Sequence, residues 1–80
     1  MNDKRRLAVL GSTGSVGEQA LDVADKFELE LSCISANKNF LRVEEQARRF
    51  GVEAVAMADY TAAKELKTRL ADTDIKISFS

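Results

Sequence analysis

A glycine-rich turn near the beginning of the chain constrains its fold more than any other feature. Gly11–Gly17 reads GSTGSVG, follows the apolar run Leu7–Leu10 and leads into a helical pattern. Glycine permits the positive φ angles of a sharp strand-to-helix turn and leaves backbone N–H groups open to a phosphate. The positive end of the following helix dipole adds favourable charge there. The turn therefore predicts a pyrophosphate site in the first βα unit of a dinucleotide-binding domain.

The spacing of the glycines is less specific than their position. It is G-x-x-G-x-x-G, and Thr13 stands where the common G-x-G-x-x-G motif has its middle glycine. A glycine-bearing turn that binds nothing is therefore the alternative. The apolar run directly before the turn favours the phosphate site.

Composition limits the other kinds of function. The chain has 80 residues and a formal net charge of −1, from 12 basic and 13 acidic side chains. This suits one small domain and indicates no nucleic-acid partner. No apolar stretch is long enough to span a bilayer, and the N-terminus lacks the hydrophobic region of a signal peptide. With one cysteine, Cys33, and no histidine, neither an internal disulfide nor a Cys/His metal site can form. We expect a cytoplasmic protein with no membrane partner and no metal ligands in this chain.

Apolar residues recur at spacings of three and four after the turn, which predicts a helix over about Ser15–Lys26. The members of this stripe are Val16, Ala20, Val23, Ala24 and Phe27. We expect this face of the helix to pack on a sheet.

The rest of the chain continues the alternation of strands and helices. The patterns predict a strand over 29–36, a helix with the stripe Phe40, Val43, Ala47 and Phe50, a strand over 52–57, a helix through Ala63, Leu66 and Leu70, and a strand over 75–79. Asn39 is a suitable cap and Gly51 a suitable stop for the second helix, and Asp59 or Thr61 can cap the third. Short connections favour parallel strands joined by right-handed helical crossovers. The predicted fold is α/β, the first βαβαβαβ half of a Rossmann-like doubly wound parallel sheet. We expect residues 1–80 to be the N-terminal part of that domain in a longer protein, because later loops usually complete such sites.

The turn after the second predicted strand bears on the choice of cofactor. A site for NAD usually has Asp or Glu there to bind the ribose hydroxyls, whereas this turn reads Asn37-Lys38-Asn39. Lys38 can pair with a 2′-phosphate, and the two Asn side chains offer amide donors. The turn favours NADPH. The alternative is that the asparagines form only a turn and a cap, with Lys38 in solvent.

A second motif has the spacing of a catalytic pair but not its location. Tyr60 and Lys64 are spaced like the Tyr-x-x-x-Lys of short-chain dehydrogenases, in which the lysine lowers the pKa of the tyrosine. That pair belongs on a later helix, beside the nicotinamide. We therefore interpret Tyr60 as a helix-entry residue and Lys64 as a surface lysine.

Three segments together carry a resemblance to a known family: Leu10–Gly17, Ala20-Leu21-Asp22-Val23 and Ala36-Asn37-Lys38-Asn39. In register, they resemble the 1-deoxy-D-xylulose 5-phosphate reductoisomerases. The resemblance covers the whole of this chain but only the N-terminal part of those enzymes, which are longer. The resemblance implies that NADPH is held around its pyrophosphate by Thr13, Gly14, Ser15 and Val16, and around its 2′-phosphate by Asn37, Lys38 and Asn39. It also implies a turn glycine at Gly11 and a packing glycine at Gly17. The family often has glycine at the position of Asn37; asparagine also tolerates left-handed geometry.

The resemblance further implies what the longer enzyme would do. The family isomerises 1-deoxy-D-xylulose 5-phosphate and reduces the product with NADPH to 2-C-methyl-D-erythritol 4-phosphate, in non-mevalonate isoprenoid biosynthesis. It uses Mg²⁺ or Mn²⁺, and the full-length enzyme is expected to be a homodimer acting on this phosphorylated sugar. Its catalytic and metal-binding residues come later than this chain, so the 80 residues alone are expected to be inactive. The alternatives are another reductase, of the semialdehyde or short-chain type, and a non-enzymatic NADP(H) sensor.

Overall fold

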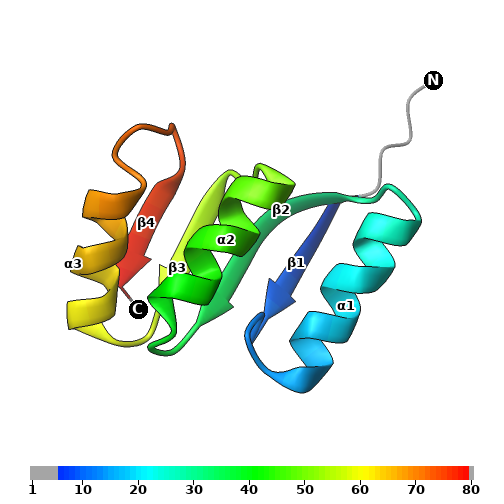
Figure 1. Cartoon of the computed structure of the whole chain (residues 1–80), viewed down its shortest axis with the longest axis horizontal. Coiled ribbons are helices and arrows are strands. Elements are labelled where there is room, and N and C mark those ends of the chain that lie inside the picture. Colours follow the sequence, from blue (N-terminus) through cyan, green and yellow to red (C-terminus); the bar gives the residue numbers. More distant parts are fainter. Residues whose placement is uncertain (1–5, 80) are drawn as a thin grey trace.

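The computed structural model describes residues 6–79, in which four strands alternate with three helices (Figure 1). In chain order the elements are β1 (Arg6–Leu10), α1 (Ser15–Lys26), β2 (Glu30–Ala36), α2 (Phe40–Phe50), β3 (Ala54–Met57), α3 (Tyr60–Arg69) and β4 (Lys76–Phe79). The predicted order of elements is confirmed, and their ends lie close to the predicted ones. Within the described residues, every helix is too short or too polar to cross a bilayer.

The four strands form one parallel sheet in the order β1-β2-β3-β4. One row of neighbours crosses the whole sheet through Val9, Ile34, Val55 and Ile77, so β-branched side chains lie next to one another on the same face. The register between β1 and β2 shifts between Leu7 and Ala8. Beyond that shift, the carboxyl ends of β1, β2 and β3 are aligned at one edge of the sheet.

All three helices lie on the same face of the sheet (Figure 1). Each crossover joins neighbouring parallel strands and steps in the same direction, so right-handed connections place every helix on one side. Within residues 6–79 the strand order does not reverse, so β4 lies beside β3 and not on the far side of β1. The α/β, Rossmann-like class is confirmed. The core lies between this helical layer and the sheet, and its buried residues include Val9, Leu21, Ile34, Val43, Val55, Met57 and Leu66.

The ends of α2 and α3 follow from local sequence signals. The side chain of Asn39 accepts a hydrogen bond from the backbone N–H of Arg42 at 3.2 Å, so Asn39 caps α2 as predicted. Gly51 ends this helix with a left-handed φ of 59°. For α3 the cap is Asp59, whose carboxylate accepts from the N–H of Ala62 at 2.9 Å, and not the alternative, Thr61.

Helix α1 uses a different face from the predicted one. The side chains of three predicted members are 79%, 49% and 64% exposed, namely Val16, Val23 and Phe27. The buried residues of the helix are instead Gly17, Leu21 and Ala24. The prediction was therefore wrong for the three exposed members and right for Ala24, which is buried, and for Ala20, which is partly buried against the core. The reason is a backbone contact: a Cβ on Gly17 would lie 2.0 Å from the carbonyl oxygen of Gly11, so this side of α1 lies directly on the turn.

Candidate functional site

The connections from strands to helices meet at one edge of the sheet, at the carboxyl ends of β1, β2 and β3 (Figure 1). A cavity of about 320 Å³ lies there, lined by Gly11, Ser35, Ala36, Asn37, Ala56 and Ala58. Most of these side chains are small, so the backbone of all three connections is accessible from the cavity. Ligands of open α/β sheets bind at such an edge.

The glycine-rich turn leaves the start of α1 open. Gly11 has a φ of 65°, in the left-handed region, and turns the chain out of β1. Gly14 is the N-cap of α1, with extended backbone angles of −81° and 169°, and it has no side chain with which to cap the helix. Helices α2 and α3, in contrast, are capped by side chains. The first N–H groups of α1 can therefore donate to an anion, and the helix dipole favours negative charge there.

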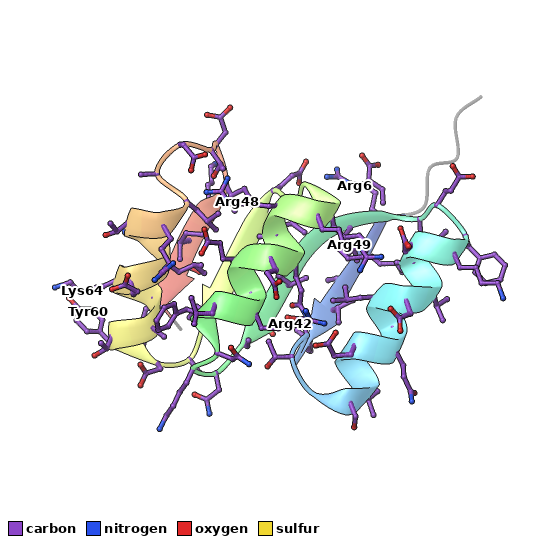
Figure 2. All side chains as sticks on the ribbon, viewed as in Figure 1. Arg6, Arg42, Arg48, Arg49, Tyr60 and Lys64 are labelled. Atoms are coloured by element: carbon purple, nitrogen blue, oxygen red, sulfur yellow. The ribbon has the colours of Figure 1, made fainter. Side chains whose placement is uncertain are left out.

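A charged pair stands beside this helix terminus. Arg42 on α2 donates two hydrogen bonds to the Glu18 carboxylate in the first turn of α1, at 2.8 and 2.9 Å, and Figure 2 shows Arg42 extending from α2 toward α1. These bonds hold the pKa of Glu18 below its ordinary value, with a smaller lowering from Gln46, while desolvation acts in the opposite direction. Glu18 thus remains ionised, and Arg42 offsets the repulsion that its carboxylate would exert on a bound phosphate.

The second turn is ordered by backbone contacts and leaves its side chains in solvent. The carbonyl of Asn37 accepts from the N–H of Asp59 at 3.1 Å, and that of Lys38 accepts from the N–H of Phe40 at 2.7 Å. Asn37, Lys38 and Asn39 are all exposed. The oxygen of the Asn39 side chain is occupied by the cap of α2, which leaves its amide N–H groups available.

Left-handed geometry is not needed at Asn37. Among residues 6–79, Glu28 is the one non-glycine residue with a positive φ, at 54°. Asn37 does not have a positive φ. Its tolerance of left-handed backbone geometry therefore does not explain why asparagine stands at this position. The side chain of Asn37 remains free to face the cavity, which it lines.

The structure brings the two predicted phosphate turns to the same edge. The N–H of Ser12 donates to the carbonyl of Ser35 at 2.9 Å, which links the first turn to the end of β2. Gly11 and Asn37 line one cavity. In the first turn the predicted site residues are Thr13, which is half-buried, and Gly14, Ser15 and Val16, which are exposed. Their contacts with a cofactor stay predictions.

Sequence reasoning missed one residue next to the turn. Gln46 on α2 is 4% exposed and donates from its side-chain amide to the carbonyl of Ser12 at 2.9 Å. Gln46 comes three residues after Val43 and directly before Ala47, both of which are fully buried. Helical periodicity therefore places it on the buried face of α2, and that was the available signal.

Tyr60 and Lys64 form a packing contact, in agreement with their interpretation as structural residues. Tyr60 is the first residue of α3. The Lys64 ammonium lies 5.7 Å from the centroid of the Tyr60 ring, and both side chains are labelled in Figure 2. The same ring meets the Phe79 ring edge to face, with centroids 5.5 Å apart. These are cation–π and aromatic contacts, with the lysine over the ring face.

Comparisons with known proteins agree with one another. Residues 7–80 match the family model described as 1-deoxy-D-xylulose 5-phosphate reductoisomerase. The 1-deoxy-D-xylulose 5-phosphate reductoisomerase of Acetivibrio thermocellus is 46% identical over 72 residues, which are 90% of this chain and 19% of that protein. The protein of the same name from Desulfitobacterium hafniense is 43% identical over 75 residues, 91% of this chain and 20% of its own length. A solved structure, 1-deoxy-D-xylulose 5-phosphate reductoisomerase from Zymomonas mobilis in complex with NADPH, aligns with a TM-score of 0.91 at 27% identity and covers 100% of this chain and 22% of that one. The chain thus spans about a fifth of the length of the curated relatives that it matches.

Proposed function

Because this chain belongs to the 1-deoxy-D-xylulose 5-phosphate reductoisomerase family, we propose that it is the N-terminal, NADPH-binding part of an enzyme with that activity. The similar structure from Zymomonas mobilis is a complex with NADPH. The open terminus of α1 and the cavity beside it suit the same cofactor. The family match favours this proposal over a semialdehyde or short-chain reductase and over a non-enzymatic sensor.

The pyrophosphate would rest on the first turn. Backbone N–H groups of Thr13, Ser15 and Val16 lie where β1 turns into α1, at the positive end of the helix dipole. The N–H of Gly14 donates to the carbonyl of Gly11 at 3.0 Å, so Gly14 contributes chiefly by having no side chain. Gly14 matters here because a Cβ at this exposed position would stand between the backbone and a phosphate oxygen. The uncapped start of α1 is the single observation that carries the proposal.

The adenosine 2′-phosphate would be bound by the second turn. Lys38 supplies an exposed ammonium group, and Asn37 and Asn39 supply amide donors on either side of it. The backbone of this turn is already fixed by Asp59 and by the cap of α2, so little ordering is needed on binding. This arrangement favours NADPH over NADH.

The remaining parts of the reaction belong to the longer enzyme. We propose that it converts 1-deoxy-D-xylulose 5-phosphate to 2-C-methyl-D-erythritol 4-phosphate as a cytoplasmic homodimer, within non-mevalonate isoprenoid biosynthesis. Bound NADPH supplies the hydride, and residues outside this chain hold the Mg²⁺ or Mn²⁺ ion and the substrate phosphate. The role of the present residues is to bind and orient the cofactor, so the chain by itself is expected to be inactive.

A fluorescence titration tests cofactor binding by the 80-residue chain. NADPH is expected to bind at least about tenfold more tightly than NADH, a difference of about 1.4 kcal/mol, because only NADPH has a phosphate for Lys38. Equal affinity for the two nucleotides would contradict the assignment of the second turn.

The activity of the longer enzyme needs a separate assay. With the deoxyxylulose phosphate and Mg²⁺ or Mn²⁺, the enzyme is expected to consume NADPH in step with formation of the reduced product. If the enzyme binds NADPH but does not consume it in this assay, the proposed activity is wrong and only cofactor binding remains.

A further inference from the structure

Two buried polar residues meet beneath the first turn. Ser12 is 0% exposed and Gln46 is 4% exposed, and both lie among the otherwise apolar buried residues. The Nε2 atom of Gln46 donates to the carbonyl oxygen of Ser12 at 2.9 Å. The contact joins α2 to the glycine-rich turn across 34 positions of the sequence.

Packing alone does not explain a glutamine at this position. Within the described part of the chain, the Oε1 atom of Gln46 and the hydroxyl of Ser12 are buried without a hydrogen-bond partner. Such atoms cost free energy, and methionine would fill a similar volume without adding a buried amide oxygen. The contributions specific to glutamine are therefore the hydrogen bond from Nε2 to the Ser12 carbonyl and the smaller effect on the pKa of Glu18.

This hydrogen bond determines the orientation of a peptide group in the turn. In a trans peptide the C=O of one residue and the N–H of the next point in opposite directions. The Ser12 carbonyl points inward to Gln46, so the N–H of Thr13 points away from the core. The other side of Ser12 is fixed as well, because its own N–H donates to Ser35 at 2.9 Å.

We propose that Gln46 is a positioning residue that directs the Thr13 N–H toward the cofactor pyrophosphate by holding the Ser12 carbonyl. This inference rests on the proposed function, because it assigns the Thr13 N–H to the pyrophosphate. Gln46 itself does not touch the cofactor. Without its side-chain donor, the peptide between Ser12 and Thr13 can rotate, and one donor to the pyrophosphate is lost.

The main test compares Gln46→Met with the wild-type chain for two ligands. NADPH binds both turns, whereas adenosine 2′-monophosphate has no pyrophosphate and reports on the second turn. The variant is expected to bind NADPH about tenfold more weakly, as for one charge-assisted hydrogen bond. It should bind adenosine 2′-monophosphate as the wild type does. Gln19→Met, the same change at an exposed position of α1, is the matched control and should leave both affinities unchanged.

A second variant covers the case in which Gln46→Met does not fold. In Gln46→Glu the charged carboxylate cannot donate to the Ser12 carbonyl, but the protonated carboxyl can. Relative to the wild type at the same pH, its affinity for NADPH is expected to rise as the pH is lowered from about 8 to about 5.5. Burial and the neighbouring Glu18 carboxylate raise the pKa of such a carboxyl, and the nearby Arg42 guanidinium acts in the opposite direction. A purely structural role would restore the affinity for adenosine 2′-monophosphate to the same degree, whereas the positioning role restores the affinity for NADPH alone.

The outcomes separate this inference from the proposed function. If the wild-type chain binds NADPH and a folded Gln46→Met variant binds it equally well, the positioning role is wrong and the proposed function stands. The role is also wrong if the variant loses both ligands to the same degree, or if Gln46→Glu shows no recovery at low pH. If the wild type does not bind NADPH, the proposed function fails, and this inference fails with it.

Discussion

Replacing Gly17 with alanine is expected to remove most of the stability of the chain. The new Cβ would lie 2.0 Å from the carbonyl oxygen of Gly11 and 2.8 Å from both Gly11 C and Ser12 Cα. All three are backbone atoms, so α1 itself would have to move away from the turn. Overpacking of this kind costs about 3 kcal/mol or more, a large part of the stability of so small a domain. Urea denaturation followed by circular dichroism measures the loss.

The matched control is alanine at Gly14, in the same turn. There the Cβ would lie 3.5 Å from the Gly11 oxygen, which is ordinary contact, and the φ of −81° suits any residue. We expect Gly14→Ala to fold with nearly wild-type stability and to bind NADPH more weakly, because its Cβ covers the phosphate position. If Gly17→Ala is as stable as Gly14→Ala, the close contact between α1 and the turn is wrong.

Replacing Lys38 with glutamate is expected to abolish the preference for NADPH. The substitution removes the ammonium group and places a carboxylate beside the doubly charged 2′-phosphate. The dissociation constant for NADPH should rise about 30-fold, or about 2 kcal/mol, the scale of a hydrogen bond to a charged group. NADH lacks this phosphate, so its affinity should change little. Parallel fluorescence titrations with the two nucleotides give the ratio.

A charge change elsewhere separates this local effect from the effect of net charge. Lys26→Glu alters the charge by the same amount in the last turn of α1, at the opposite end of the helix from the glycine-rich turn. It should leave the ratio of the two affinities as it is in the wild type. If Lys38→Glu leaves the ratio of the affinities for NADPH and NADH unchanged, the second turn does not bind the 2′-phosphate.

The order and ends of the elements could be predicted because their signals are local. The cap at Asn39 and the stop at Gly51 depend on residues within one helical turn, and both occupy the predicted positions. Alternation in β2 and the short connections led to a parallel α/β sheet. The three segments that resemble the reductoisomerases indicated the family to which the chain belongs.

The face on which α1 packs could not be predicted from periodicity alone. Three members of the predicted stripe, Val16, Val23 and Phe27, are exposed. The buried face is the neighbouring one, with Gly17, Leu21 and Ala24. The choice between the two faces is made by the close approach of Gly17 to the backbone of Gly11. A hydrophobicity pattern contains no information on such a contact, because glycine contributes almost nothing to it.

The location of the two turns could be predicted from the sequence. The hydrogen bond that holds the first turn from below could not. Both turns were placed by motif and spacing, and the structure brings them to one edge of the sheet. The hydrogen bond from Gln46 to Ser12 joins residues 34 positions apart and therefore depends on the packing of α2 against the sheet, where it contacts β2. Helical spacing shows that Gln46 lies on the buried face of α2, but nothing in the sequence indicates that its side chain bonds to Ser12.

The most direct test of the central claim is an NMR titration of the isotopically labelled chain with NADPH. We expect the largest shifts of backbone amide resonances at Thr13, Gly14, Ser15 and Val16, with a second group at Asn37–Asn39. With NADH, the first group should shift and the second should respond much less. If NADPH leaves the amides of the first turn unchanged while shifting others, the pyrophosphate is not bound at the start of α1, and the account is wrong.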